Sequence, residues 1–540
     1  MQFDSTKLNN TLFNENYKQI YAILVAMRIK NSMKNMIYVY SSTLLLAIMN
    51  FVVRRVFLDI LTVDYLGYDG LFTSIFSFLN LSEMGIASII TYHMYSEIAS
   101  NNTDEIRKLL YIYKKIYRVV GTFVLVAGIV VSLFIPFILK GSQKDSWAFI
   151  YTIYFLQLLA TLCTYFLAYR RVLFQTHQRL YVCTTVDTIA NLVSVLLKMV
   201  VLLVFRNYIV YLLIAIANNI TTNLIIAKLS KKEYPEITAY DVTREDMKAL
   251  NLFSEVKNML ATKIALTVYG GSDDIIITSI LGISYSGLLS NYRMISSKIQ
   301  ELILSMFNSL QASIGNLVYD KEAQKGKGFF KALDLLGFYM GLVCATGVMT
   351  VGQTLILLWL KNTKFLLPDL FIILLSINMY IAISNNPMAY FRNSLGHFDL
   401  DRNYMIGAAI TNVILSVALA FPLGISGVMA GTVAGHILIF IGRARVVHEF
   451  YLKETPNRYY LLSVFRVLML GISCVLSITM FRYLGAIIEN RLLLFLISGF
   501  ASVIISTIIF IISSAKSEAF KVLLEYFKTV FGMVTKKKNI

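Results

Sequence analysis

The chain has 540 residues, of which 57% are hydrophobic and only 15% charged, and its formal net charge is +18. A soluble chain of this length carries about a quarter charged residues, so this composition excludes a soluble protein. Apolar blocks of about twenty residues recur along the chain, and a helix of that length crosses a hydrocarbon core about 30 Å thick. The sequence therefore predicts an all-α integral membrane protein, and the positive-inside rule explains its net charge without a nucleic-acid partner.

Fourteen transmembrane spans are expected, arranged as two pseudo-symmetric six-helix lobes plus two extra helices. In chain order we predict a cytoplasmic segment (1–35), an N-lobe (36–227), a cytoplasmic linker (228–258), a C-lobe (259–447), spans thirteen and fourteen (448–513) and a basic amphipathic tail (514–540). The spans are expected near residues 36–61, 71–92, 117–139, 148–169, 182–205, 208–227, 260–281, 288–316, 333–360, 365–391, 403–421, 425–442, 463–481 and 492–513. The tail suits a helix on an anionic leaflet, or alternatively a polar cap on the bundle.

The distribution of basic residues predicts the orientation. Of the 49 Lys and Arg, 35 lie in connections on the side of the N-terminus, 7 lie on the other side and 7 lie inside spans. Because basic residues concentrate in cytoplasmic loops, both termini are expected in the cytoplasm. The outer connections are all short, which argues against a polymerase or ligase with a folded outer catalytic loop.

Weak internal similarity supports the two lobes. The tripeptide KNM opens each bundle, at 34–36 and 257–259, and each second span begins with a glycine, Gly70 or Gly287, before an apolar stretch. A duplicated transporter of this kind places its substrate site at the interface between the repeats.

Charged residues inside spans are candidates for function, because each costs about 2.5–3.5 kcal/mol at mid-membrane on insertion scales. In span one, Arg55 and Asp59 are four residues apart and are predicted to form a structural ion pair. Arg54 has no acidic residue one turn away and is expected to face a cavity as an anion-binding cation.

Span eight carries Arg293, Lys298 and Glu301. Arg293 is expected to face a polar cavity, whereas Lys298 and Glu301 are three apart and can form a neutral pair. Lys198 in span five can line the same cavity, and Lys263 in span seven lies near the cytoplasmic end, where it can snorkel. The excess of buried cations predicts an anionic substrate and disfavours hydrophobic drug cations.

Two adjacent carboxylates, Asp273 and Asp274, follow two glycines in span seven. Both cannot face lipid, so at least one is expected to meet a cation, water or a proton, and Arg54 is a candidate partner. The four cysteines are scattered in apolar blocks without metal-ligand spacing. No metal site, cofactor or catalytic motif is predicted, so the chain is expected to be a transporter and not an enzyme.

Three segments resemble bacterial polysaccharide flippases of the multidrug, oligosaccharidyl-lipid and polysaccharide exporter superfamily. They are LGYDGLFTSIFSFLNLSEMGI (66–86), SDDIIITSILG (272–282) and SYSGLLSNYRMISSKIQELILSMFNSLQASIGNL (284–317). The resemblance implies two six-helix lobes in a V, alternating access, and transfer of undecaprenyl-diphosphate-linked oligosaccharide from the inner to the outer leaflet of the bacterial cytoplasmic membrane. Membrane lipids and polysaccharide assembly enzymes are the other expected partners.

The resemblance also implies roles for the charged residues. Arg54, Arg293, Lys198, Lys263 and Lys298 become candidates for binding the diphosphate, and spans thirteen and fourteen become candidates for a lipid-tail groove. Protonation or Na⁺ binding at Asp273, Asp274 or Glu301 is the hypothesis for ion coupling. The alternatives that remain open are a lipid II flippase, a multidrug cation exporter and, from a different class, a membrane polysaccharide polymerase.

Overall fold

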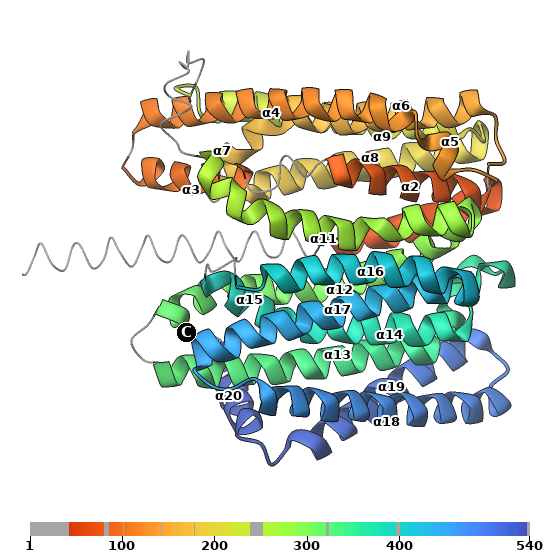
Figure 1. Ribbon diagram of the computed structural model, residues 1–540, viewed down its shortest axis with the longest axis vertical. Helices are drawn as coiled ribbons and strands as arrows, with labels where there is room; N and C mark the ends of the chain where they lie inside the picture. Colours follow the sequence, from red (N-terminus) through yellow and green to blue (C-terminus); the bar gives the residue numbers. More distant parts are fainter. Residues whose placement is uncertain are drawn as a thin grey trace, which may run out of the picture. The chain divides into compact units, whose positions relative to one another are not determined.

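The computed structural model describes residues 41, 43–79, 86–100, 102–141, 143–177, 179–237, 252–319, 323–395 and 400–536 (Figure 1). Within these ranges the chain is helical and contains no strand, as the composition predicts. The first described helix covers residues 43–60.

The helices of the N-terminal half follow in chain order. They are α2 (Val63–Leu79), α3 (Ile86–Ala99), α4 (Thr103–Ser132), the short α5 (Ile135–Ile138), α6 (Trp147–Leu167), the 3-10 turn η2 (Ala168–Arg170), α7 (Arg171–Thr176), α8 (Leu180–Val204) and α9 (Tyr208–Glu233). The expected span 71–92 therefore falls on two helices, α2 and α3, and α2 begins eight residues earlier than predicted.

The C-terminal half contains longer helices. They are α11 (Leu252–Ile280), α12 (Ile283–Tyr319), α13 (Ala323–Leu360), the 3-10 turn η3 (Thr363–Phe365), α14 (Asp369–Ser384), α15 (Asn386–Leu395), α16 (Arg402–Leu423), α17 (Ile425–Val446), the π-helical η4 (Val447–Leu452), α18 (Asn457–Ile487), α19 (Arg491–Ser514) and α20 (Glu518–Lys536). The expected span 365–391 covers α14 and part of α15, with a break at Asn385.

Ten of the described helices are long and apolar enough to cross a membrane. The protein is therefore a multi-pass membrane protein. Helices α11 and α12, which carry the charged residues considered below, are not among the ten, and the count of fourteen spans stays a prediction.

The described residues form two compact units. The first unit comprises the described residues within Met1–Val56, Ile86–Phe123 and Leu158–Asn251. The second unit comprises those within Phe57–Gly85, Val124–Gln157 and Leu252–Ile540. In the second unit α11, α16 and α17 lie side by side, and α18 lies beside α19 (Figure 1). All the contacts described below lie within one unit or the other.

Small residues allow α16 and α17 to pack closely. A glycine recurs every four residues on α17, at Gly427, Gly431 and Gly435, and a Cβ on the first would overlap the carbonyl oxygen of Leu419 on α16. Such small residues are common between membrane helices, because they let two backbones approach. The contact holds two helices of the candidate site in one register.

Helices α2 and α12 cross at two glycines that contact each other's helix reciprocally. A Cβ on Gly67 would overlap the carbonyl oxygen of Ile283, and a Cβ on Gly287 would overlap that of Val63. The two contacts are related by an offset of about 220 positions, which pairs Gly67 with Gly287. This offset differs by three residues from the one that aligns Gly70 with Gly287.

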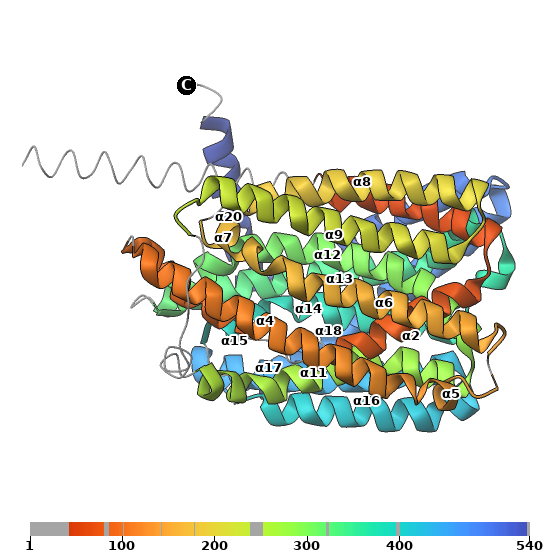
Figure 2. The ribbon, with the colours of Figure 1, turned by 90° about the horizontal axis from the view of Figure 1, so that it is seen from above.

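The C-terminal helix α20 packs against the bundle by its first half. Its Glu518 pairs with Lys331 of α13 (3.0 Å), and Tyr526 stacks edge-on against Phe329. Figure 2 shows α20 crossing the direction of the long helices. These contacts agree with the expectation of a cap on the bundle for this half of the helix.

Candidate functional site

A buried carboxylate joins three helices of the second unit. Asp274 of α11, whose side chain is 2% exposed, forms an ion pair with Arg293 of α12. Ser74 of α2 and Ser286 of α12 donate hydrogen bonds to its two oxygens (2.8 and 3.0 Å). The Arg293 side chain stays 41% exposed, so it can neutralise Asp274 and still present N–H groups to an anion.

The partner of this carboxylate differs from the sequence expectation. Arg54 was the candidate partner for the two acids, but Asp274 pairs with Arg293. The two residues are nineteen positions apart, and they meet because α11 and α12 turn back on each other at residues 281–282. Gly70 of α2 faces this pair, since a Cβ there would lie 3.3 Å from the Ser286 hydroxyl and 3.5 Å from an Asp274 oxygen.

The adjacent carboxylate points to a different set of helices. Asp273 accepts hydrogen bonds from Thr432 of α17 (2.9 Å) and Asn412 of α16 (3.5 Å), and it is 7% exposed. Asn412 in turn accepts a bond from Ser272 (2.8 Å). Among the described residues no cation forms an ion pair with Asp273, although Arg293 and Asp274 lie close enough to act on it electrostatically. Hydroxyl and amide groups contact its oxygens directly, an environment suited to a proton or a small cation.

A further polar cluster lies where α2 and α12 begin, at their predicted outer ends. Lys144, in the connection between α5 and α6, contacts Asp64 (3.0 Å) and Ser284 (2.8 Å). Ser284 also donates to Asp64 (2.5 Å). These bonds tie the connection to both crossing helices, beside the Gly67 and Gly287 contacts.

Burial raises the pKa of Asp145, the neighbour of Lys144, and the like charge of Asp64 adds to this effect. A raised pKa in the folded state means that Asp145 contributes stability below its unfolded pKa, about 3.9, and loses that contribution as pH rises through its folded pKa. Asp145→Asn is therefore expected to raise the unfolding temperature at pH 7 and to lose this advantage near pH 4. Thermal unfolding in detergent across this range measures the effect. Glu489→Gln, in another predicted outer connection, is the control, and an equal shift at both pH values for Asp145→Asn would contradict the prediction.

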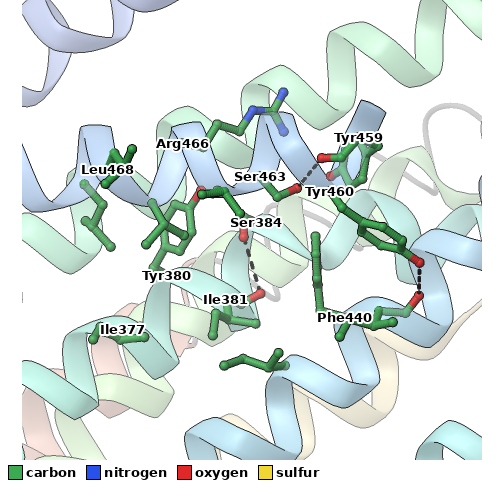
Figure 3. Close-up of a pocket in the computed structure, with 15 residues that line it drawn as sticks. Ile377, Tyr380, Ile381, Ser384, Phe440, Tyr459, Tyr460, Ser463, Arg466 and Leu468 are labelled. Atoms are coloured by element: carbon green, nitrogen blue, oxygen red, sulfur yellow. Dashed lines mark hydrogen bonds between the residues drawn. The ribbon is translucent and has the colours of Figure 1, made fainter. Parts of the chain in front are cut away.

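An apolar groove of about 440 Å³ opens between α14, α17 and α18 (Figure 3). Its lining includes Tyr380, Ile381, Phe440, Val464 and Leu468. It involves span thirteen, as expected for a lipid-tail groove, but the other walls are α14 and α17, and α19 contributes no lining residue.

The comparisons with known proteins agree with this architecture. Residues 32–310, just over half of the chain, match the family described as "Polysaccharide biosynthesis protein". The chain belongs to this polysaccharide biosynthesis family. No curated protein matches the chain.

Solved structures share the fold of this family member. It resembles "Lipid II flippase MurJ, inward closed conformation" with a TM-score of 0.66 and 13% identity, over 90% of this chain and 100% of that one. It also resembles a multidrug resistance MATE family transporter of the MOP superfamily in an inward-facing conformation (TM-score 0.53, 13% identity, 76% and 98% covered). The Vibrio cholerae MATE transporter VcmN, as a D35N mutant, matches similarly (0.54, 13%, 78% and 98%). The fold is therefore of the MOP transporter type.

The structure gives contacts for two of the other predicted site residues of this polysaccharide biosynthesis protein, Lys298 and Lys198. Lys298 forms an ion pair with Glu301 (2.7 Å), which confirms the neutral pair. Lys198 lies over the ring of Tyr211, 4.7 Å from its centroid. The side chain of Lys263 lies outside the described residues. The pairing of Arg55 with Asp59 and the role of Arg54 stay predictions.

Two ion pairs in this family member were not predicted from the sequence. Arg171 binds both oxygens of Asp187 at 2.8 Å. Arg466 of α18 pairs with Asp334 of α13 (2.8 Å), with both side chains under 10% exposed. The first pair joins the consecutive helices α7 and α8, and the second joins helices far apart in sequence. A charge in an apolar block was the signal available for Asp187 and Arg466.

Proposed function

We propose that the protein moves a polyprenyl-diphosphate-linked oligosaccharide from the inner to the outer leaflet of a bacterial cytoplasmic membrane by alternating access. The observation that carries the proposal is Arg293, a partly exposed guanidinium held by a buried carboxylate in the membrane domain of a polysaccharide biosynthesis family member. A guanidinium binds phosphate oxygens with charge-assisted hydrogen bonds. Arg54 is proposed as the second cation for the diphosphate.

The apolar groove supports a lipid substrate. Its walls are almost entirely hydrocarbon and aromatic surface, which suits a polyprenyl chain. Arg466 does not compete for the diphosphate there, because it pairs with Asp334 and lies over the ring of Tyr459. A multidrug cation exporter would need acids where this site presents Arg293.

Reconstitution tests the proposal. The protein is placed in vesicles with a fluorescent polyprenyl-diphosphate oligosaccharide on one leaflet, and wild type is compared with the variant carrying Arg54→Ala and Arg293→Ala. We expect wild type to accelerate leaflet exchange and the double variant to lose this acceleration. Absence of exchange by wild type, with or without proton and Na⁺ gradients, would overturn the proposal, and transport of organic cations would then be measured.

A lipid II flippase is the second candidate, supported by the fold shared with MurJ over 90% of the chain. Both substrates carry a polyprenyl diphosphate, so the sugar is what distinguishes them. Unlabelled lipid II added to the same vesicles should compete weakly if the substrate is a polysaccharide repeat and strongly if it is lipid II.

Asp273 is proposed as the coupling residue. Its carboxylate, the Asn412 and Thr432 side chains and the Val428 carbonyl, which accepts a bond from Thr432 (3.1 Å), offer oxygens for a proton or Na⁺. Asp273→Asn is expected to remove the dependence of leaflet exchange on an ion gradient, because the amide cannot bind either ion as the carboxylate does. Exchange is measured with imposed proton and Na⁺ gradients separately. Ser279→Ala, which removes a hydroxyl bonded only to its own helix in the described structure, is the control, and unchanged gradient dependence of Asp273→Asn would contradict this role.

A further inference from the structure

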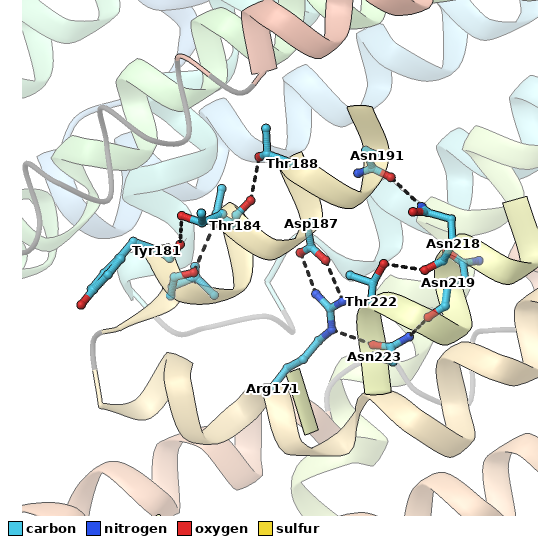
Figure 4. Close-up of polar contacts among 12 residues, drawn as sticks. Arg171, Tyr181, Thr184, Asp187, Thr188, Asn191, Asn218, Asn219, Thr222 and Asn223 are labelled. Carbon is cyan, nitrogen blue, oxygen red and sulfur yellow. Dashed lines mark hydrogen bonds and ion pairs between the residues drawn. The ribbon is translucent and has the colours of Figure 1, made fainter. Parts of the chain in front are cut away.

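A row of polar side chains runs through the hairpin of α8 and α9 in the first unit (Figure 4). It is formed by Arg171, Asp187, Asn191, Asn218, Asn219, Thr222 and Asn223. Asn191 and Asn218 lie at least ten residues from either end of their helices, which is about 15 Å at the rise of an α-helix. Uncharged amides at such depth are unfavourable in hydrocarbon unless a partner or a ligand satisfies them.

One end of the row is fully engaged in holding the hairpin. Arg171 of α7 binds both oxygens of Asp187 on α8 and donates from Nε to Asn223 on α9 (2.9 Å). The amide of Asn223 then donates to the Asn219 carbonyl (2.9 Å). These residues use their donors on one another, so they position the two helices.

The middle of the row keeps hydrogen-bonding capacity. Asn218 donates to the side-chain oxygen of Asn191 (2.8 Å). In the described part of the chain, no bond uses the remaining amide group of Asn191 or the side-chain oxygen of Asn218. Together the two residues offer a donor and an acceptor at the centre of the hairpin.

A groove of about 480 Å³ lies beside this pair. Asn218, Thr221 and Ser194 contribute polar groups to its lining, and the other lining residues are apolar, among them Val193, Leu197 and Ile214. No charged side chain lines it within the described residues. The lining is mostly apolar, like that of the groove beside α18, and its polar groups come from three side chains. It therefore suits an uncharged ligand that presents C–H faces and few hydroxyl groups, and it lacks the cations that a diphosphate needs.

We propose that this groove binds sugar units of the transported lipid, with Asn218 of its lining as the hydrogen-bonding residue. The inference rests on the proposed function and adds to it a carbohydrate subsite separate from Arg293. Neighbouring hydroxyls of a sugar can donate to the side-chain oxygen of Asn218 and accept from its second amide hydrogen, while the C–H faces pack on valine and leucine.

The alternative is that the pair only joins α8 to α9, as interhelical amides do in membranes. A purely structural amide would affect every substrate alike. A sugar-binding amide would affect substrates in proportion to the sugars they carry. The two readings therefore differ in substrate dependence.

Leaflet exchange of two lipid probes separates the readings. One probe carries a single N-acetylglucosamine on polyprenyl diphosphate. The other carries a neutral trisaccharide, and several trisaccharides made of glucose, galactose and N-acetylglucosamine are tested in turn. For Asn218→Ala we expect KM for the trisaccharide lipid to rise about 5–10-fold, the loss expected for one or two hydrogen bonds, with little change for the single-sugar lipid. Thr188→Val is the matched control on α8, because its hydroxyl donates to its own helix at Thr184 (2.6 Å).

Equal losses with both probes, or no change with either, would overturn the subsite. Binding of the free trisaccharides to the detergent-solubilised full chain, followed by saturation-transfer NMR, tests it independently of transport. If wild type binds and Asn218→Ala does not, with unchanged unfolding temperatures, the subsite stands even if no lipid is transported. If wild type exchanges the lipids but binds none of the trisaccharides, the subsite is wrong while the proposed function stands.

Discussion

Arg293→Ala is expected to abolish leaflet exchange of the lipid-linked oligosaccharide and also to destabilise the fold. The substitution leaves Asp274 buried with only two serine hydroxyls as partners. An unsatisfied buried group costs about 1–3 kcal/mol, and we expect the free energy of unfolding to fall by this amount. The loss is smaller than for a fully buried ion pair because the Arg293 side chain is 41% exposed. Exchange rates in vesicles and unfolding midpoints in detergent measure the two effects.

A second substitution separates the two effects. Adding Asp274→Ala removes the unpaired carboxylate, so the double variant should recover most of the stability but none of the transport. Lys331→Ala is a matched control, since Lys331 is 42% exposed and pairs with Glu518 on the surface, where such pairs contribute about 0–1 kcal/mol. Recovery of transport in the double variant would show that Arg293 serves only to neutralise Asp274.

Gly67→Val is expected to force α2 away from α12. The Cβ would overlap the carbonyl oxygen of Ile283, and a backbone atom cannot rotate away as a side chain can. Overpacking typically costs about 1–3 kcal/mol, and we expect the upper end of that range here. One readout is the unfolding midpoint. The other is the rate at which a membrane-impermeant maleimide labels a cysteine introduced by Leu71→Cys in a variant without native cysteines. Leu71 is 1% exposed in wild type.

Gly70→Ala is the matched control on the same helix. A Cβ there would meet the Ser286 hydroxyl at 3.3 Å and an Asp274 oxygen at 3.5 Å, so small side-chain shifts can accommodate it. We expect near-normal stability and slow labelling. If the two substitutions behaved alike, the helix crossing would not depend on Gly67.

The sequence predicts the fold class well, because hydrophobic length and loop charge are local properties. Helices α8 and α9 begin within two residues of the expected spans 182–205 and 208–227. The break at Asn385 and the early start of α2 were not predicted, although Pro387 follows the break by two residues and Asp64 lies in the first turn of α2. Packing partners decide such boundaries.

The candidate site was predictable in composition but not in pairing. Adjacent acids after two glycines pointed to Asp273 and Asp274, because carboxylates are costly in an apolar block. Which cation meets which acid depends on how α11 and α12 fold back, and on which helices lie opposite each carboxylate. The same limit hid the partner of Asp187, because Arg171 reaches it only through the bend at η2 and α7.

The reciprocal glycine contact fits the predicted duplication. Under that prediction Gly67 and Gly287, and likewise Val63 and Ile283, take equivalent places in the two repeats. A half-length ancestor would have formed this helix crossing as a two-fold symmetric homodimer. In that dimer the same residue type would have occupied both of the positions that Asp64 and Ser284 now hold. Two aspartates there would repel, so we expect a separately expressed N-terminal half to self-associate more strongly with Asp64→Ser, as cross-linking in membranes can measure. Fusion of two such halves into one chain would allow one copy to keep a carboxylate that a symmetric dimer would exclude.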